Sequence, residues 1–144
     1  MKNIKFITGI WNGIYTYDSE EFNGESIRFT MSLTLENGEI IGQCYDSLDD
    51  RGIPLLTTIR GFIEGKNIRL VKQYPFLIYI DETGEYRKKE TTPQTEAHYQ
   101  GEIESGMVKG IWELELGSYD QSDKIDIKHV TGKWEMKKQI LIWA

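Results

Sequence analysis

The chain has 144 residues, of which 39% are hydrophobic and 28% are charged, with a formal net charge of -6 and an isoelectric point near 5.0. This length suits one domain with a single core. No apolar run approaches the roughly 18 residues of a membrane helix. The acidic balance opposes binding to nucleic acid or anionic lipid, because that attraction needs clustered lysine and arginine. We expect a single globular domain over residues 1–144 without nucleic-acid or membrane partners.

The cysteine content and the first residues predict a cytoplasmic location. Cys44 is the sole cysteine, which excludes an internal disulfide and fits a reducing compartment. The apolar residues between Met1 and Ile10 are interrupted by Lys5, Thr8 and Gly9, so no hydrophobic segment of signal-peptide length forms.

Apolar and polar residues alternate along most of the chain, as in strands with one buried face. The clearest case is 27–35, where Ile27, Phe29 and Met31 share one side. In 9–17 apolar residues stand on both sides, which predicts that both faces are covered. The predicted strands are 9–17, 27–35, 40–46, 55–63, 68–74, 76–80 continuing at Tyr86, two strands within 99–116, and 129–138.

Short turns separate these strands. Asn37-Gly38 favours a two-residue hairpin, residues 64–67 give a second, and Glu104-Ser105-Gly106 gives a third in which Gly106 supplies a positive φ. Residues 88–97 and 117–128 are polar without a period, so we expect rim loops there.

A glycine two residues before a tryptophan recurs at Gly9-Ile10-Trp11, Gly110-Ile111-Trp112 and Gly132-Lys133-Trp134. No segment has a helical apolar stripe, and a meander of strands leaves two edges unless it closes. The shared signature at both ends favours pairing of the last strand with the first. We predict an all-β, single-domain antiparallel meander barrel of about eight to ten strands, with an interior that is filled or holds one small ligand.

The opening Gly9-Ile10-Trp11 resembles the G-x-W motif of lipocalins. The stretch from Gly9 to Gly42, with the strand 30–35 leading into Asn37-Gly38-Glu39, resembles the first three strands of avidin-type barrels. The lipocalin Thr-Asp-Tyr element is missing, and the serine and threonine of the later avidin strands are not found at matching points. The resemblance therefore implies a calycin-type barrel with a ligand at its open end, and it does not imply biotin as that ligand.

Aromatic residues supply the first group of candidate ligand-binding side chains. Trp11, Tyr15, Trp112 and Trp134 share the inward phase of their strands. One interpretation is that they fill the barrel core. The other is an aromatic cup, in which the four rings stack on a flat ligand.

Lys72 is the most informative charge, because it shares the phase of Leu70 and Tyr74 and is predicted to point inward. A buried ammonium needs a partner, since desolvation disfavours its charge. We predict Asp46 as that partner, with Tyr74 and Tyr99 completing a polar lining. The alternative is that Lys72 and Asp46 lie at strand ends and reach solvent.

Other chemistry has little support. His98 and His129 are separated by a hairpin and a loop, and Cys44 is remote from both, so we expect no metal and no cofactor. No nucleophile or phosphate-loop motif is present, and we expect no catalytic residue. The glutamates Glu102, Glu104, Glu113 and Glu115 fall on the outward phase.

The chain ends with the apolar residues Ile140, Leu141, Ile142 and Trp143, which either extend the last strand or contact another copy in a homo-oligomer. The first functional hypothesis is a non-enzymatic barrel that binds a small apolar or aromatic molecule at its mouth. The alternatives are a structural or protein-interaction module with a filled interior, and a barrel isomerase or cyclase with Lys72 or Asp46 handling protons.

Overall fold

The computed structural model describes residues 7–18, 26–47, 55–75, 77–80, 83, 86–89, 95–119 and 125–139. Within these ranges no helix is long and apolar enough to span a membrane. The C-terminal residues Ile140 to Trp143 lie outside the described ranges. The strands are β1 (Gly9–Tyr17), β2 (Ser26–Glu36), β3 (Glu39–Ser47), β4 (Leu55–Glu64), β5 (Asn67–Gln73), β6 (Leu77–Ile80), β7 (Tyr86–Lys89), β8 (Glu96–Glu104), β9 (Met107–Tyr119) and β10 (Ile125–Lys138).

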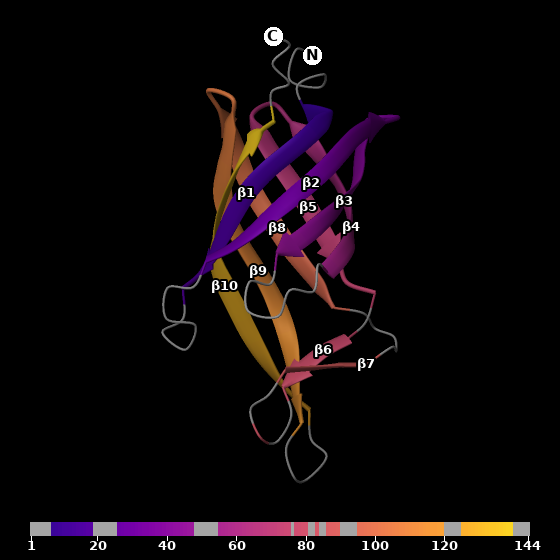
Figure 1. Cartoon of the computed structure of the whole chain (residues 1–144), viewed down its shortest axis with the longest axis vertical. Coiled ribbons are helices and arrows are strands. Elements are labelled where there is room, and N and C mark those ends of the chain that lie inside the picture. Colours follow the sequence, from indigo (N-terminus) through magenta and orange to yellow (C-terminus); the bar gives the residue numbers. More distant parts are fainter. Residues whose placement is uncertain are drawn as a thin grey trace.

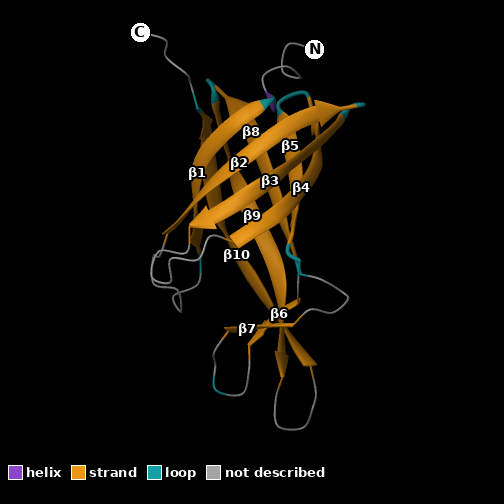
Figure 2. Ribbon diagram, turned by 45° about the vertical axis from the view of Figure 1, so that its right-hand side comes forward, coloured by secondary structure: helices purple, strands orange, loops and turns teal. Residues whose placement is uncertain are grey.

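Eight of these strands form a closed antiparallel barrel in the order β1-β2-β3-β4-β5-β8-β9-β10 (Figure 1). Closure is made by β10 and β1, with Trp11 opposite Lys138 and Tyr17 opposite Gly132. The strands cross the barrel obliquely, as closure of a small barrel requires (Figure 2). The predicted all-β meander and the predicted pairing of the last strand with the first are both confirmed.

Tight turns join the strands at the end of the barrel where β1 begins, which we call the hairpin end. Asn37 and Gly38 both have positive φ, at 51° and 81°, and Ser105 and Gly106 do as well, at 51° and 79°. Positive φ at both central positions is the type I′ geometry, whose twist matches that of the flanking strands. The predicted hairpins at these two places are confirmed.

The opposite end of the barrel is the β6 end, beyond which β6 and β7 lie (Figures 1 and 2). Here β6 pairs in parallel with β9, Tyr79 opposite Gly117 and Ile80 opposite Ser118. Residues 117–119 continue β9, residues 125–128 belong to β10, residues 88–89 belong to β7, and residues 96–97 open β8. The predicted rim loops at 88–97 and 117–128 are wrong at these positions, because backbone ladders form without an alternating pattern of side chains.

The inward side chains form one continuous core. It runs from Ile7, just before β1, to Val130 near the β6 end, and includes the predicted set of β2. On β1 the opposite face is open, because Ile10 is 45% and Ile14 36% exposed. The expectation that both faces of this strand are covered is therefore wrong. A closed barrel covers the inner face of each strand and leaves the outer face to solvent.

The repeated glycine and tryptophan pair has a structural explanation in the register of β9 and β10. Gly132 stands opposite Trp112, and Trp134 stands opposite Gly110. A Cβ atom on Gly132 would overlap the carbonyl oxygen of Thr16 and the indole of Trp112. The Trp112 indole N–H donates to that same Thr16 oxygen at 3.0 Å. Each glycine thus makes room for the tryptophan of the neighbouring strand.

We predict that Gly132→Ala lowers the free energy of unfolding by about 1–3 kcal/mol, because the added methyl group must displace Trp112 or the backbone of β1. Urea unfolding would measure the loss, and near-ultraviolet circular dichroism would report the movement of the indole. Lys133→Ala is the matched control, since Lys133 is the exposed neighbour on the same strand and its loss should stay within about 0.5 kcal/mol. Equal stability of the two variants would contradict the packing role of Gly132.

Candidate ligand site in the barrel interior

A buried ion pair crosses the interior of the barrel. Lys72 of β5 and Asp46 of β3 belong to strands separated by β4, yet the Lys72 Nζ lies 2.9 Å from Oδ1 and 2.8 Å from Oδ2 of Asp46. Their side chains are 0% and 1% exposed. The predicted pairing is confirmed, and the alternative that both groups reach solvent is wrong.

Further polar groups complete the hydrogen bonding of this pair. Lys72 also donates to the hydroxyl oxygen of Tyr99 at 3.2 Å. The Tyr15 hydroxyl donates to Asp46 Oδ2 at 3.3 Å, and the Cys44 thiol donates to Asp46 Oδ1 at 3.4 Å. Each carboxylate oxygen therefore accepts from Lys72 and from one uncharged donor. Such satisfaction is what allows a charge pair to persist in a low-dielectric interior.

Tyrosine rings surround the ammonium group of Lys72. Its Nζ lies 4.9 Å from the ring centroid of Tyr15, and 5.4 Å from those of Tyr74 and Tyr99. These distances are within the range at which a cation is attracted by the electron-rich face of an aromatic ring. We call these three residues the tyrosine cage. Asp46 and the cage together hold the ammonium from several sides.

The surroundings keep Lys72 charged. Burial alone would lower the pKa of Lys72, but the oxygens around the ammonium outweigh it and raise the pKa well above its usual value. The contributing groups are Tyr74, Tyr99, Asp46 and Tyr15. Lys72 is therefore an ammonium throughout the physiological range, and it has no free electron pair with which to act as a base or a nucleophile.

The neutral acids of the cluster are held in their protonated forms. Burial raises the pKa of Tyr15 and of Tyr99 well above the usual value, and raises the pKa of Tyr74 as well. Burial also raises the pKa of the Cys44 thiol to about 12. A thiol in this state is inert toward oxidants and electrophiles, because the thiolate is the reactive form.

Of the two interpretations of the tryptophans, the structure supports packing in the barrel core, since all three are buried there, and not an aromatic cup. Trp112 packs edge-on against Tyr15, with ring centroids 5.4 Å apart, and so contacts the cage. Trp134 lies behind Tyr99, with centroids 5.3 Å apart, and its indole N–H donates to the backbone oxygens of Gln100 and Ile111. Trp11 lies near the start of β1 and donates to the Ile7 oxygen at 2.9 Å. The alternation of apolar and polar residues correctly predicted that all three tryptophans point into the barrel. It did not predict how far along the barrel axis each one lies.

The structure thus brings together most of the predicted ligand-binding residues: Tyr15, Asp46, Lys72, Tyr74, Tyr99 and Trp112. It places Trp134 behind this group and Trp11 toward the hairpin end. The prediction missed two members of the cluster. Cys44 bonds Asp46, and the ring of Tyr17 lies 5.2 Å from that of Trp112. The phase of each strand would have identified both, since Cys44 precedes Asp46 by two residues and Tyr17 follows Tyr15 by two.

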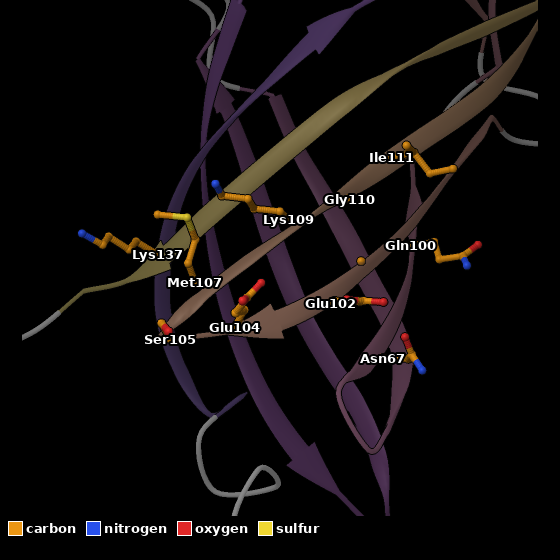
Figure 3. A pocket seen from close by; sticks show the side chains of 11 residues that line it. Asn67, Gln100, Glu102, Glu104, Ser105, Met107, Lys109, Gly110, Ile111 and Lys137 are labelled. Carbon is orange, nitrogen blue, oxygen red and sulfur yellow. The ribbon is translucent and has the colours of Figure 1, made fainter.

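A separate groove of about 700 Å³ lies on the outer wall of the barrel (Figure 3). Its lining includes Glu102 and Glu104 of β8 and Lys109 and Ile111 of β9, and none of the predicted ligand-binding residues. Ile111 is 61% exposed there. The groove is lined by side chains of both charge signs, and its polar lining side chains are exposed. In the described ranges, no three His, Cys, Asp or Glu side chains gather as metal ligands would.

The sequence matches no family model and no curated protein. Similar solved structures include the crystal structure of rhizavidin, at 12% identity and a TM-score of 0.45, which covers 92% of this chain and 87% of that one. The crystal structure of a rhizavidin–biotin complex is similar at 13% identity and a TM-score of 0.45, over 92% of this chain and 97% of that one. The antiparallel meander barrel expected from the sequence is present in the strand order itself.

We predict that Lys72→Met costs about 3–5 kcal/mol of unfolding free energy, because it leaves the Asp46 carboxylate buried without its counter-ion. The double variant Lys72→Met/Asp46→Asn should recover about half of that loss or more, since the amide is neutral, its one carbonyl oxygen can accept from the Cys44 thiol, and its NH₂ group can donate to the Tyr15 hydroxyl oxygen. A double-mutant cycle by chemical unfolding would measure the coupling. Lys66→Met, in an exposed turn, is the control. Full stability of Lys72→Met would contradict the role of the pair.

We also predict alkaline unfolding from about pH 9 upward. A group with a higher pKa in the folded protein than in the unfolded one contributes stability below its unfolded pKa and loses it as pH rises. For Cys44 the pH range over which stability is lost begins at the ordinary thiol pKa of 9.0 and ends at the folded-state pKa of about 12. The cage tyrosines follow from 10.0, and Lys72 from 10.5, because their folded pKa values are also raised.

The measurement is urea unfolding at intervals between pH 7 and pH 11. Cys44→Ala should keep its full stability about one pH unit further, to near pH 10, because the thiol is the first of these groups to ionise in the unfolded chain. Stability that stays constant to pH 11 in the parent protein would show that the cluster does not hold its protons in the folded state.

Proposed function

We propose that this protein is a non-enzymatic barrel that binds a small, uncharged, aromatic or apolar molecule at its β6 end. In this proposal the tyrosine cage, Lys72 and Asp46 form the floor of the site, and Trp112 forms part of its wall. The observation that carries the proposal is the uneven distribution of polarity in the interior.

The hairpin end is filled with apolar side chains. Trp11, Met31, Leu33, Ile68 and Met136 are all buried there. The polar cluster lies closer to the β6 end: Tyr15 is two residues from the end of β1, Asp46 is one residue from the end of β3, and Tyr74 directly follows β5. A core needs no polar group for stability alone, and replacing a buried ion pair by apolar residues is often neutral or stabilising. Polar groups held at one end of a barrel are therefore better explained by a ligand that they orient.

Charge balance supports an uncharged ligand. Within the described residues the buried charges are those of Lys72 and Asp46, and they cancel. A charged ligand beside them would lose its hydration without gaining a counter-ion, which costs several kcal/mol. A neutral molecule with a carbonyl or ring nitrogen can instead accept a hydrogen bond from a tyrosine hydroxyl and lay its flat face on Trp112.

The geometry favours binding over catalysis. Lys72 is fixed as an ammonium, and both oxygens of Asp46 already accept hydrogen bonds. Neither group is poised to move a proton, so nothing in this cluster favours the isomerase or cyclase alternative.

One observation favours the filled structural or interaction module as a second candidate. Among the described residues, each buried side-chain nitrogen and oxygen has a hydrogen-bond partner within the protein. A cluster that is complete in itself can serve as packing, with a protein partner binding at the rim. The two candidates differ in whether a small molecule stabilises the protein.

The test is a thermal-shift and tryptophan-fluorescence screen against uncharged aromatic and apolar metabolites, their charged analogues, and biotin. We expect saturable stabilisation by uncharged compounds. Tyr99→Phe should weaken the binding about 5- to 30-fold, the effect of one hydrogen bond in a buried site. Trp112→Phe should weaken binding and remove the fluorescence response, whereas Trp11→Phe, the same change at the hairpin end, should leave affinity unchanged. An absence of any saturable response would favour the filled module instead.

A further inference from the structure

We infer that the tyrosine cage and Asp46 form a preformed receptor for a primary alkylammonium ion, in which Lys72 is a ligand supplied by the chain itself. Shortening Lys72 should therefore leave a site that binds a free alkylammonium of matching length. The inference stands on the contacts of the cage alone and does not depend on the proposed function.

Asp46 and the tyrosine cage contact the ammonium in two complementary ways. Asp46 Oδ1 and Oδ2 and the Tyr99 hydroxyl accept its N–H groups at 2.9, 2.8 and 3.2 Å. The faces of the three tyrosines lie 4.9 to 5.4 Å from the same nitrogen. The first set requires N–H donors, and the second requires positive charge. A primary ammonium satisfies both requirements, whereas an alcohol lacks the charge and a quaternary ammonium lacks the donors.

Asp46 and two of the three cage tyrosines, Tyr15 and Tyr99, are held by contacts that do not involve Lys72. The third, Tyr74, directly follows β5 and is held through its backbone N–H, which donates to the Thr95 oxygen at 2.9 Å. Asp46 is fixed by the Tyr15 hydroxyl and by the Cys44 thiol. The ring of Tyr15 packs against Trp112, and the ring of Tyr99 packs against Trp112 and Trp134. These residues come from β1, β3, β8, β9 and β10, whereas Lys72 comes from β5. Removal of the Lys72 side chain should therefore leave the cage in place. The Asp46 carboxylate would then lack a counter-ion.

The length of the missing group sets the ligand. Lys72→Ala keeps Cβ and removes three methylene carbons and the ammonium nitrogen, which is the composition of 1-propylammonium. This ion is positively charged at neutral pH and can place its nitrogen where Nζ lies. Its carbon chain then follows the lysine stem, with the terminal methyl group turned aside from the Cγ position to keep van der Waals distance from the retained Cβ. Affinity is expected to come from charge, hydrogen bonds and burial of that chain together.

The experiment measures the melting temperature of Lys72→Ala with increasing 1-propylammonium chloride, at constant total ionic strength. We expect a saturable rise in melting temperature for this variant and no rise for the parent protein, in which Lys72 occupies the cage. 1-Propanol and tetramethylammonium chloride should have little effect. Lys72→Ala/Asp46→Asn, which removes the carboxylate charge, should lose most of the rise.

Other outcomes would overturn the inference. Equal stabilisation by 1-propanol would mean that the vacated space is an apolar cavity, and equal stabilisation by tetramethylammonium or in the parent would mean a non-specific salt effect. If Lys72→Ala is unfolded on its own, it is refolded from denaturant with each additive, and recovery with 1-propylammonium alone supports the cage. Failure to recover with any additive would show that the walls do not form without the tethered lysine, which also overturns the inference. None of these results bears on whether the parent protein binds uncharged ligands.

Discussion

The ion pair between Lys72 and Asp46 is the interaction on which the interior depends. The two residues belong to strands that are not neighbours, and their side chains meet because the closed sheet turns their inward faces toward each other. Two charges removed from water require excellent geometry and additional hydrogen bonds if the structure is to tolerate them. Tyr15, Cys44 and Tyr99 supply those bonds. Each bond constrains the position of the strand that carries the residue. The polar cluster therefore fixes the relative placement of β1, β3, β5 and β8 around one point.

Tryptophans fix the wall of the barrel in a different way. Trp112 of β9 reaches past Gly132 of β10 to donate to Thr16 of β1, and so connects two strands across the one between them. Trp134 of β10 does the same toward Gln100 of β8, where Gly101 and Gly110 leave space in the wall. The glycine is thus the part of the motif that lets the indole cross the neighbouring strand. The first copy of the motif acts differently, because Trp11 donates locally to Ile7 at the hairpin end.

The positions of the strands, and which of their side chains point inward, could be predicted because both follow from the two-residue period of a half-buried strand. That period was enough to turn Lys72 and Asp46 inward and to select them as partners. It could not place Trp11 and Trp112 at different depths, since depth depends on the register between strands, which no single strand displays. Beyond the barrel, the prediction of a strand at 76–80 that continues at Tyr86 agrees with β6 and β7. The parallel pairing of Tyr79 and Ile80 with β9 could not be predicted, because the pattern within one strand does not show which strand it pairs with.

A ligand site beside a completed ion pair would work differently from one with a free charge. The pair fixes the surrounding hydroxyls and carries no net charge, so recognition would come from shape, ring stacking and hydrogen bonds to uncharged acceptors. Discrimination in such a site arises from the penalty for leaving a buried donor unpaired more than from the bond that is gained. A charged competitor would fail for a related reason, because its desolvation would bring no new counter-ion. In such a site the ion pair would discriminate between ligands through the desolvation penalty that it imposes on charged ones, without forming a charged contact to the ligand that binds.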